Sequence, residues 1–157
     1  MKTVIKFNIY LVFISLINSI GLALDLTRQD AIEKTVLLKG EKGKAHFYEP
    51  NKLTFTTGKL YKLIIKNKSN SKHYFSSNSF SKSIFTRKVQ VTFQNQKIAE
   101  IKGVINEVEV WPDQHLEWWF VPIKTGVFKD LECKVYDEKT KLYHSDMGMK
   151  GCLLYTS

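Results

Sequence analysis

From residue 44 onward, the chain is a succession of short segments in which apolar and polar residues alternate, each closed by a turn residue. Alternation with a period of two predicts strands that bury one side, and the interrupting Gly, Pro, Asn and Asp predict tight connections. The predicted strands are residues 45–48, 52–56, 60–67, 89–93, 97–101, 106–111, 115–121 and 126–133. Seven or more strands at this spacing favour an all-β Greek-key fold, a β-sandwich or a barrel. The one predicted helix covers residues 28–38, with Asp30 as its cap, and residues 76–79 are predicted to be a loop.

Length and composition fit one folded domain. The 157 residues, 43% of them apolar, can bury one sizeable core without disulfides or a structural zinc. Three prolines and eight glycines leave no linker long enough to separate two folded units. Two-domain enzymes and disordered chains are therefore excluded.

The N-terminus has the pattern of a secretory signal peptide. Lys2 and Lys6 precede an apolar run at residues 10–17, and residues 21–23 place small side chains where a signal peptidase reads them. The alternative is an uncleaved membrane anchor, but the run is short for a span and an asparagine follows it. We therefore expect residues 1–23 to be removed and the protein to be periplasmic or secreted.

The C-terminus has an unusual end. Residues 152–157 are the translation expected when the transposon end of a sequencing library is read as coding sequence, so we expect a non-native tail. Cys152 would then be foreign, and a disulfide to Cys133, the usual outcome for paired cysteines in an oxidising compartment, is disfavoured. The expected division is an N-terminal extension at 24–43, a domain at 44–151 and this tail.

The charge is basic but dispersed. The formal net charge is +9, and removing residues 1–23 leaves 22 basic and 15 acidic residues. Lysines that alternate with apolar residues are typical of the solvated side of strands; the alternative is an electrostatic surface for an acidic protein or an anionic membrane. No nucleic-acid motif is present, and we expect no nucleic-acid partner. We expect a monomer that touches a membrane only if the signal segment is retained.

Three metal-binding residue types follow one another near the end of the domain. Cys133 closes a predicted strand, His144 stands eleven positions later and Met149 five positions after that. Thiolate, imidazole and thioether form a soft ligand set, and copper is the metal that combines two imidazoles and a thiolate with a weak axial methionine. His73, after the polar turn, supplies the second imidazole. The sequence predicts one copper ion, cycling between Cu(I) and Cu(II).

Four segments, in order, also resemble those of one known family. They are residues 47–50 with Gly58; residues 65–67 leading to His73; residues 120–122 and 126–128 leading to Cys133; and His144 with residues 148–151. The family is the cupredoxins, the blue-copper proteins that include plastocyanin and azurin. The resemblance covers residues 44–151 and implies a cupredoxin-like β-sandwich. It also implies that His73, Cys133 and His144 are equatorial ligands and that Met149 is axial.

The chain departs from the family between Cys133 and His144. Ten residues separate them, which is long for this loop, and the pattern around residues 137–140 predicts a small projecting hairpin. Because both ends of a hairpin lie close together, the ligands can still converge. The insertion puts the geometry of the site in doubt more than the identity of the metal.

Other chemically active residues have plainer interpretations. A single cysteine or methionine is most often core filler, and only the ordered pattern favours ligands here. Met147 is an alternative to Met149 as the axial donor. His46 and His115 lie on strand patterns with no matching partner, so we interpret both as surface or packed histidines. The tryptophans are interpreted as core and edge aromatics, namely Trp111, Trp118 and Trp119.

Three functions fit this sequence. The first is a non-catalytic, exported carrier of single electrons that meets a redox partner protein, and the basic charge is compatible with an acidic one. The second is a periplasmic copper carrier or metal-uptake accessory with the same ligands, and the third is a metal-free β-sandwich binding module. A copper oxidase or nitrite reductase is disfavoured, because such enzymes need further copper centres and a second domain.

Overall fold

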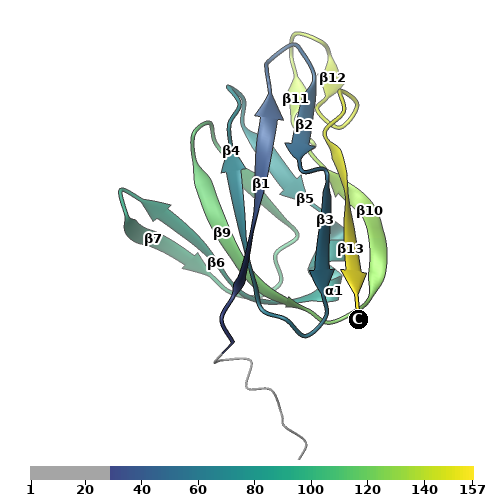
Figure 1. The fold of residues 1–157 in the computed structure, drawn as a ribbon. Coiled ribbons are helices and arrows are strands. Elements are labelled where there is room, and N and C mark those ends of the chain that lie inside the picture. The colour runs from purple at the N-terminus through teal and green to yellow at the C-terminus, as the bar shows by residue number, and fades with distance from the viewer. Residues whose placement is uncertain (1–28) are drawn as a thin grey trace, which may run out of the picture.

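Two facing β-sheets form the molecule in a computed structural model that describes residues 29–157 (Figure 1). The six strands of the first sheet are, in sheet order, β2 (His46–Glu49), β1 (Ile32–Gly40), β4 (Tyr61–Asn67), β9 (His115–Pro122), β6 (Ile84–Phe93) and β7 (Gln96–Ile101). The five strands of the second are β3 (Lys52–Thr56), β13 (Lys150–Thr156), β10 (Gly126–Glu132), β5 (His73–Ser76) and β8 (Glu107–Val110). The prediction of an all-β sandwich is confirmed.

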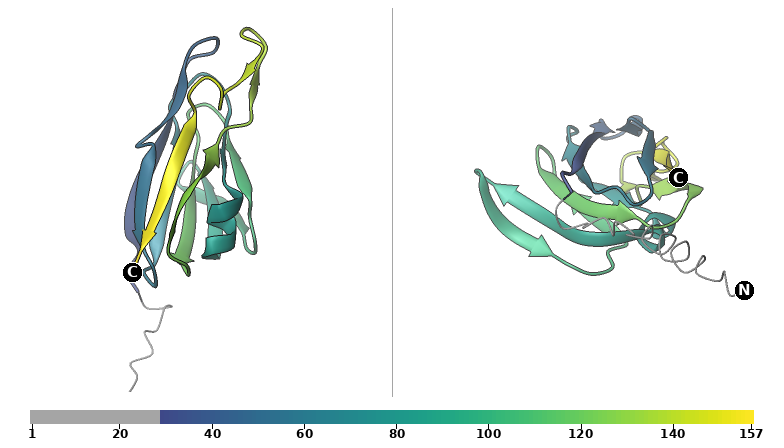
Figure 2. Two further views of the ribbon diagram at one scale, coloured as in Figure 1. Left: turned by 90° about the vertical axis from the view of Figure 1, so that its right-hand side faces the viewer. Right: turned by 60° about the horizontal axis from the view of Figure 1, so that its bottom comes forward.

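Two small elements complete the described chain. A two-stranded hairpin of β11 (Tyr136–Asp137) and β12 (Leu142–Tyr143) projects at one end, as the sequence predicts. Helix α1 (Asn78–Ser83) lies towards the other end (Figure 2). The same figure shows β6 and β7 extending away from the rest of the sandwich.

Aromatic side chains fill the space between the sheets. The alternation in β4 buries Tyr61, Leu63 and Ile65 against the facing sheet. Phe80 meets the ring of Trp118 edge to face, with centroids 4.9 Å apart. This core lies below the end of the sandwich that carries β11 and β12, and it supports the strands that end there.

The predicted helix at residues 28–38 is wrong. Residues 32–40 form β1, which runs parallel to β4 and antiparallel to β2. Val36 and Leu38 are both fully buried on the same side of this strand, whereas a helix would point them in very different directions. Pairing with two distant strands therefore outweighed the local pattern, and β1 lies within the segment predicted to be an extension.

The helix that does form begins in the predicted loop, at residue 78, and extends four residues beyond it. Ser77 caps α1 by accepting the Phe80 N–H at 3.0 Å, and its hydroxyl donates to Asp130 at 2.7 Å. Burial of Phe80 against the core adds the tertiary support that so short a helix needs.

The structure describes the C-terminal end of the chain but not the N-terminal end. The predicted signal peptide, residues 1–23, lies outside the described residues. Residues 152–157 belong mainly to β13, which pairs with β10 and β3, so this tail occupies a strand of the second sheet. Cys133 and Cys152 are both free thiols. Among residues 29–157, no helix has the length and hydropathy needed to cross a bilayer.

Candidate metal centre

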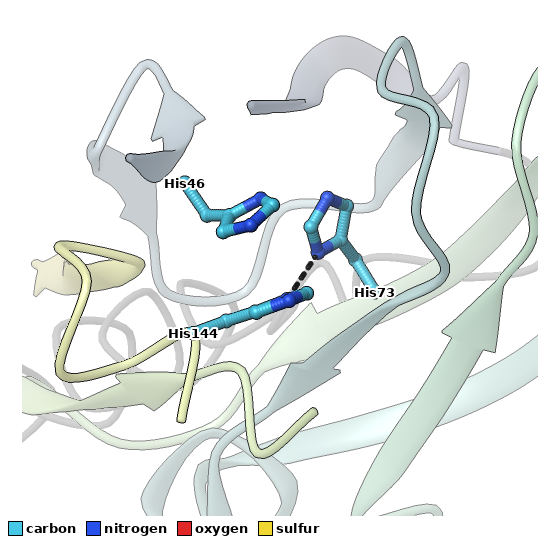
Figure 3. A group of neighbouring side chains, drawn as sticks. All are labelled: His46, His73 and His144. Atoms are coloured by element: carbon cyan, nitrogen blue, oxygen red, sulfur yellow. Dashed lines mark hydrogen bonds between the residues drawn. The ribbon is translucent and has the colours of Figure 1, made fainter. Parts of the chain in front are cut away.

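Four segments from different parts of the chain meet at the end of the sandwich beside β11 and β12. Cys133 directly follows β10, and His73 opens β5. β10 and β5 are antiparallel neighbours that pair through Glu132 and Ser76, so Cys133, the next residue, lies against the part of β5 that leads back to His73. His144 follows β12, and His46 opens β2. Figure 3 shows the three imidazoles facing one another.

The donor atoms of three predicted ligands converge. The Sγ atom of Cys133 lies 3.7 Å from Nδ1 of His73 and 3.7 Å from Nδ1 of His144. The two Nδ1 atoms are 3.0 Å apart (Figure 3). Donors bonded to one transition metal at about 2.0–2.3 Å span separations of this size. All three side chains are buried, so the cluster fits one ion shielded from water.

Met149, the fourth predicted ligand, is fully buried and held by its main chain. Its N–H donates to the His144 carbonyl at 2.9 Å, and its carbonyl accepts the Cys133 N–H at 3.2 Å. The sulfur of Met147, the alternative donor, instead accepts the Thr140 hydroxyl at 3.3 Å. The main chain thus places Met149 between two ligands, while the Met147 sulfur is engaged on the hairpin.

A buried polar network orients His73. The Oγ of Ser69 lies 2.7 Å from His73 Nε2, which leaves Nδ1 to face the cluster. Asn67 accepts the Ser69 N–H at 2.9 Å and donates to the carbonyls of Ser71 and Val110. Such hydrogen bonds behind a metal ligand set its ring orientation and tautomer.

The sulfur of Cys133 also receives backbone donors. The Tyr74 N–H donates to Sγ at 3.2 Å. Burial raises the pKa of the Cys133 thiol, and the backbone N–H groups of Tyr74 and Val135 only partly offset this effect. The metal-free thiol therefore keeps its proton at neutral pH, and an ion must displace that proton on binding.

The histidines are held in the neutral form that binds metals. Burial, together with the neighbouring imidazoles of His144 and His46, lowers the pKa of His73 to about 3. Burial and His46 lower the pKa of His144 to about 4, although the nearby Asp137 carboxylate opposes the shift. Burial also lowers the pKa of His46. At neutral pH all three rings have a free lone pair for an ion.

His46 also belongs to this cluster. It was missed at the sequence level, because it was interpreted there as a histidine without a matching partner. Its ring stacks on that of His144, with centroids 3.7 Å apart and an interplanar angle of 21°. One ligand atom each from His46, His73 and His144 lie within 4.8 Å of one another. The His46 N–H reaches the Met147 carbonyl at 3.4 Å, a contact between segments a hundred residues apart. The sequence offered one indication that His46 is buried: it lies two residues before Tyr48 in a strand, so both side chains point to the same side.

A surface pocket reaches the cluster from outside. Its lining includes His144 and Asp137 together with Lys42, Lys72, Trp111 and Tyr136. Trp118 is fully buried in the core, as expected, and Trp111 is exposed directly after the edge strand β8. Trp119 differs from the expectation, because it is half-buried on β9, an interior strand of its sheet.

No protein-family model matches the sequence, and no curated protein matches it. Solved structures do match. A multicopper oxidase from Campylobacter jejuni, described as a metallo-oxidase, superimposes with a TM-score of 0.54 at 17% identity, over 82% of this chain and 31% of the oxidase. A copper nitrite reductase from Nitrosomonas europaea gives 0.53 at 8% identity, over 82% of this chain and 50% of the reductase. Dithionite-reduced auracyanin from the photosynthetic bacterium Roseiflexus castenholzii gives 0.46 at 16% identity, over 82% and 100%.

The likenesses to the oxidase and to the reductase establish the fold. The chain is a cupredoxin-like β-sandwich, as its resemblance to that family implied. It spans about a third of the oxidase and half of the reductase. Within this fold, the grouping of His73, Cys133, His144 and Met149 fits a type 1 copper site.

Proposed function

We propose that this protein is an exported, non-catalytic copper protein that carries single electrons. His73, Cys133 and His144 would hold one copper ion, with Met149 as a weak axial donor. The observation that carries the proposal is the convergence of one thiol sulfur and two imidazole nitrogens within 3.7 Å in a buried site. Soft sulfur with imidazole is the donor set that copper selects, and it occurs here in a fold shared with copper proteins.

The chain's own residues prepare the site for this role. Copper, when bound, supplies a change of one electron between Cu(II) and Cu(I). Ser69 and Asn67 hold the His73 ring, and the Tyr74 N–H supports the sulfur. Burial keeps water away from the ligands. A site fixed in this way rearranges little when the charge of the ion changes, which favours fast electron transfer.

Docking of a redox partner would use the pocket beside His144. Lys42 brings positive charge to the pocket, whereas Lys72 is paired with Glu109. Trp111 and Tyr136 give the pocket exposed aromatic surface. An acidic partner protein suits such a surface, because opposite charges speed encounter and flat rings tolerate transient contact. Export depends on residues 1–23 acting as a signal peptide, and it is part of the proposal, as is a monomeric state.

Copper carriage is the second candidate, and His46 favours it. A third buried imidazole in the cluster gives the site more donors than a type 1 centre needs. Cyclic voltammetry of the copper-loaded protein separates the two functions. An electron carrier should show one reversible one-electron wave at a moderate potential. A copper carrier should show no such wave and should release copper to an acceptor.

The first prediction concerns Cys133. Cu(II) should bind one-to-one and give an intense thiolate-to-copper charge-transfer band, and Cys133→Ser should abolish that band because a hydroxyl cannot replace the soft donor. Visible absorption during a Cu(II) titration measures both. Cys152→Ser is the matched control and should leave the spectrum as it is. A band that survives in Cys133→Ser would refute the ligand assignment.

The second prediction separates the two methionines. Met149→Leu should retain one bound copper and shift the reduction potential, because a weak axial thioether tunes the potential more than the affinity. Met147→Leu should change the potential little, since its sulfur is occupied by Thr140. Voltammetry on both variants is the measurement. If Met147→Leu shifts the reduction potential more than Met149→Leu does, Met147 and not Met149 is the axial donor.

A further inference from the structure

His46 is buried in a way that calls for a ligand. Its side chain is fully buried, and neither Nδ1 nor Nε2 has a hydrogen-bond partner within residues 29–157. The nearest acidic group, Oδ2 of Asp137, is 3.9 Å from Nε2, which is too far for a hydrogen bond. A buried polar group without a partner costs about 1–3 kcal/mol, so proteins rarely leave one unless it has another use.

The ring of His46 also faces the metal site. It stacks on His144 and meets His73 edge-on at 5.1 Å between centroids (Figure 3). One ligand atom from each of the three rings falls within the same 4.8 Å cluster. Two of these three rings also face the thiol, because Nδ1 of both His73 and His144 lies 3.7 Å from Cys133 Sγ.

The backbone around His46 is shaped to receive its ring. Gly40 pairs with His46 across β1 and β2 and has a φ of +137°. A Cβ at Gly40 would lie 2.4 Å from His46 Nδ1 and 2.7 Å from the Ala45 carbonyl oxygen. A side chain at position 40 would therefore force the ring or the backbone beside it to shift, so Gly40 leaves the room that the His46 ring occupies.

The long insertion before His144 is tied to the same place. Asp137 of β11 accepts the backbone N–H groups of Gly43 at 2.7 Å, Lys139 at 2.7 Å and Thr140 at 3.1 Å. These bonds join the β1–β2 turn to the β11–β12 hairpin and hold a carboxylate 3.9 Å from the imidazole of His46, in a pocket that His144 also lines. A cation among the rings would balance that buried negative charge.

We propose that His46 is a third imidazole ligand, so that the ion is held by His46, His73, His144 and Cys133. The proposal deepens the copper function above and rests on it. An imidazole is a stronger donor to Cu(II) than a distant thioether, so the site should favour Cu(II) and have a lower reduction potential than one with methionine alone in the axial place.

Pulsed EPR of the Cu(II)-loaded full chain, labelled with ¹⁵N-histidine, counts the coupled imidazoles directly. We expect three in the unmodified protein and two in His46→Leu, with a raised potential and Cu(II) affinity reduced by about 10–100-fold or more. His115→Leu, which changes a half-buried histidine on β9 outside the cluster, should retain all three. His46→Gln preserves polarity and should also give two, which covers a failure of the leucine variant to fold.

The outcomes separate this inference from the proposed function. If the unmodified protein shows two coupled imidazoles and His46→Gln leaves the potential unchanged, His46 is not a ligand. A thiolate-to-copper band in the same protein would leave the copper assignment valid. Three coupled imidazoles without any thiolate band would support His46 and overturn the role of Cys133.

Discussion

Acidifying the metal-free protein from pH 7.5 to pH 5 should lower its free energy of unfolding by several kcal/mol. The folded-state pKa is about 3 for His73 and about 4 for His144, against 6.5 for an unfolded histidine. Above pH 6.5 the rings are neutral in both states and the effect is absent. Below it, only the unfolded chain takes up these protons, so stability falls as the pH falls. At pH 5 this amounts to about 2 kcal/mol for each histidine.

Urea denaturation at several pH values, with copper removed by a chelator, measures this loss. The range should stop at pH 5, because carboxylates with lowered pKa values, Asp137 and Asp130 among them, add their own effect at lower pH. His73→Gln should reduce the slope, because it removes one of the two rings. A free energy of unfolding that is the same at pH 7.5 and pH 5 would show that the histidines are not held neutral by burial.

Phe80→Ala should destabilise the protein by about 3–5 kcal/mol, the range for removing a large buried aromatic side chain. Phe80 is 1% exposed, and its ring contacts Trp118 and Phe120 at centroid distances of 4.9 and 5.0 Å. Its removal leaves a cavity at the centre of the core, and it also takes away the contact that anchors α1.

Phe85→Ala is the matched control for Phe80→Ala. Phe85 is only five residues after Phe80 in the sequence, but its side chain is 61% exposed on β6. Its removal should therefore change the free energy of unfolding by about 0.5 kcal/mol or less. Thermal or urea unfolding of both variants at pH 7.5 gives the comparison. Equal losses would contradict the core described above, in which Phe80 packs between the sheets and Phe85 does not.

Most of the strands could be read from the sequence because their causes are local. Alternation reports which side of a strand is buried, and it placed β3 at its observed bounds and β4 within one residue of them. The candidate site was predicted from the order of His73, Cys133, His144 and Met149. The two ends of a loop that joins adjacent strands lie close together in space, which brings the ligands along it together. The hairpin of β11 and β12 was predicted from the residue pattern around 137–140.

The errors arose where distant segments meet. β1 is a strand because β4 and β2 pair with it, and its own residues also fit a helix. α1 depends on Asp130, which accepts hydrogen bonds from Ser77 and Ser79 across the fold. Neither partner is visible in a local pattern, which explains why one element was given the wrong type and the other was missed.

The sequence by itself determined the donor chemistry of this protein and the all-β fold that presents it. Only the tertiary structure decided which histidines share the site. His46 enters the cluster because β2 packs against the segment around Met147, and because Gly40 leaves room for its ring. Ligand chemistry is a property of single residues and is written in the chain, whereas the convergence of side chains depends on packing between segments that are far apart in sequence.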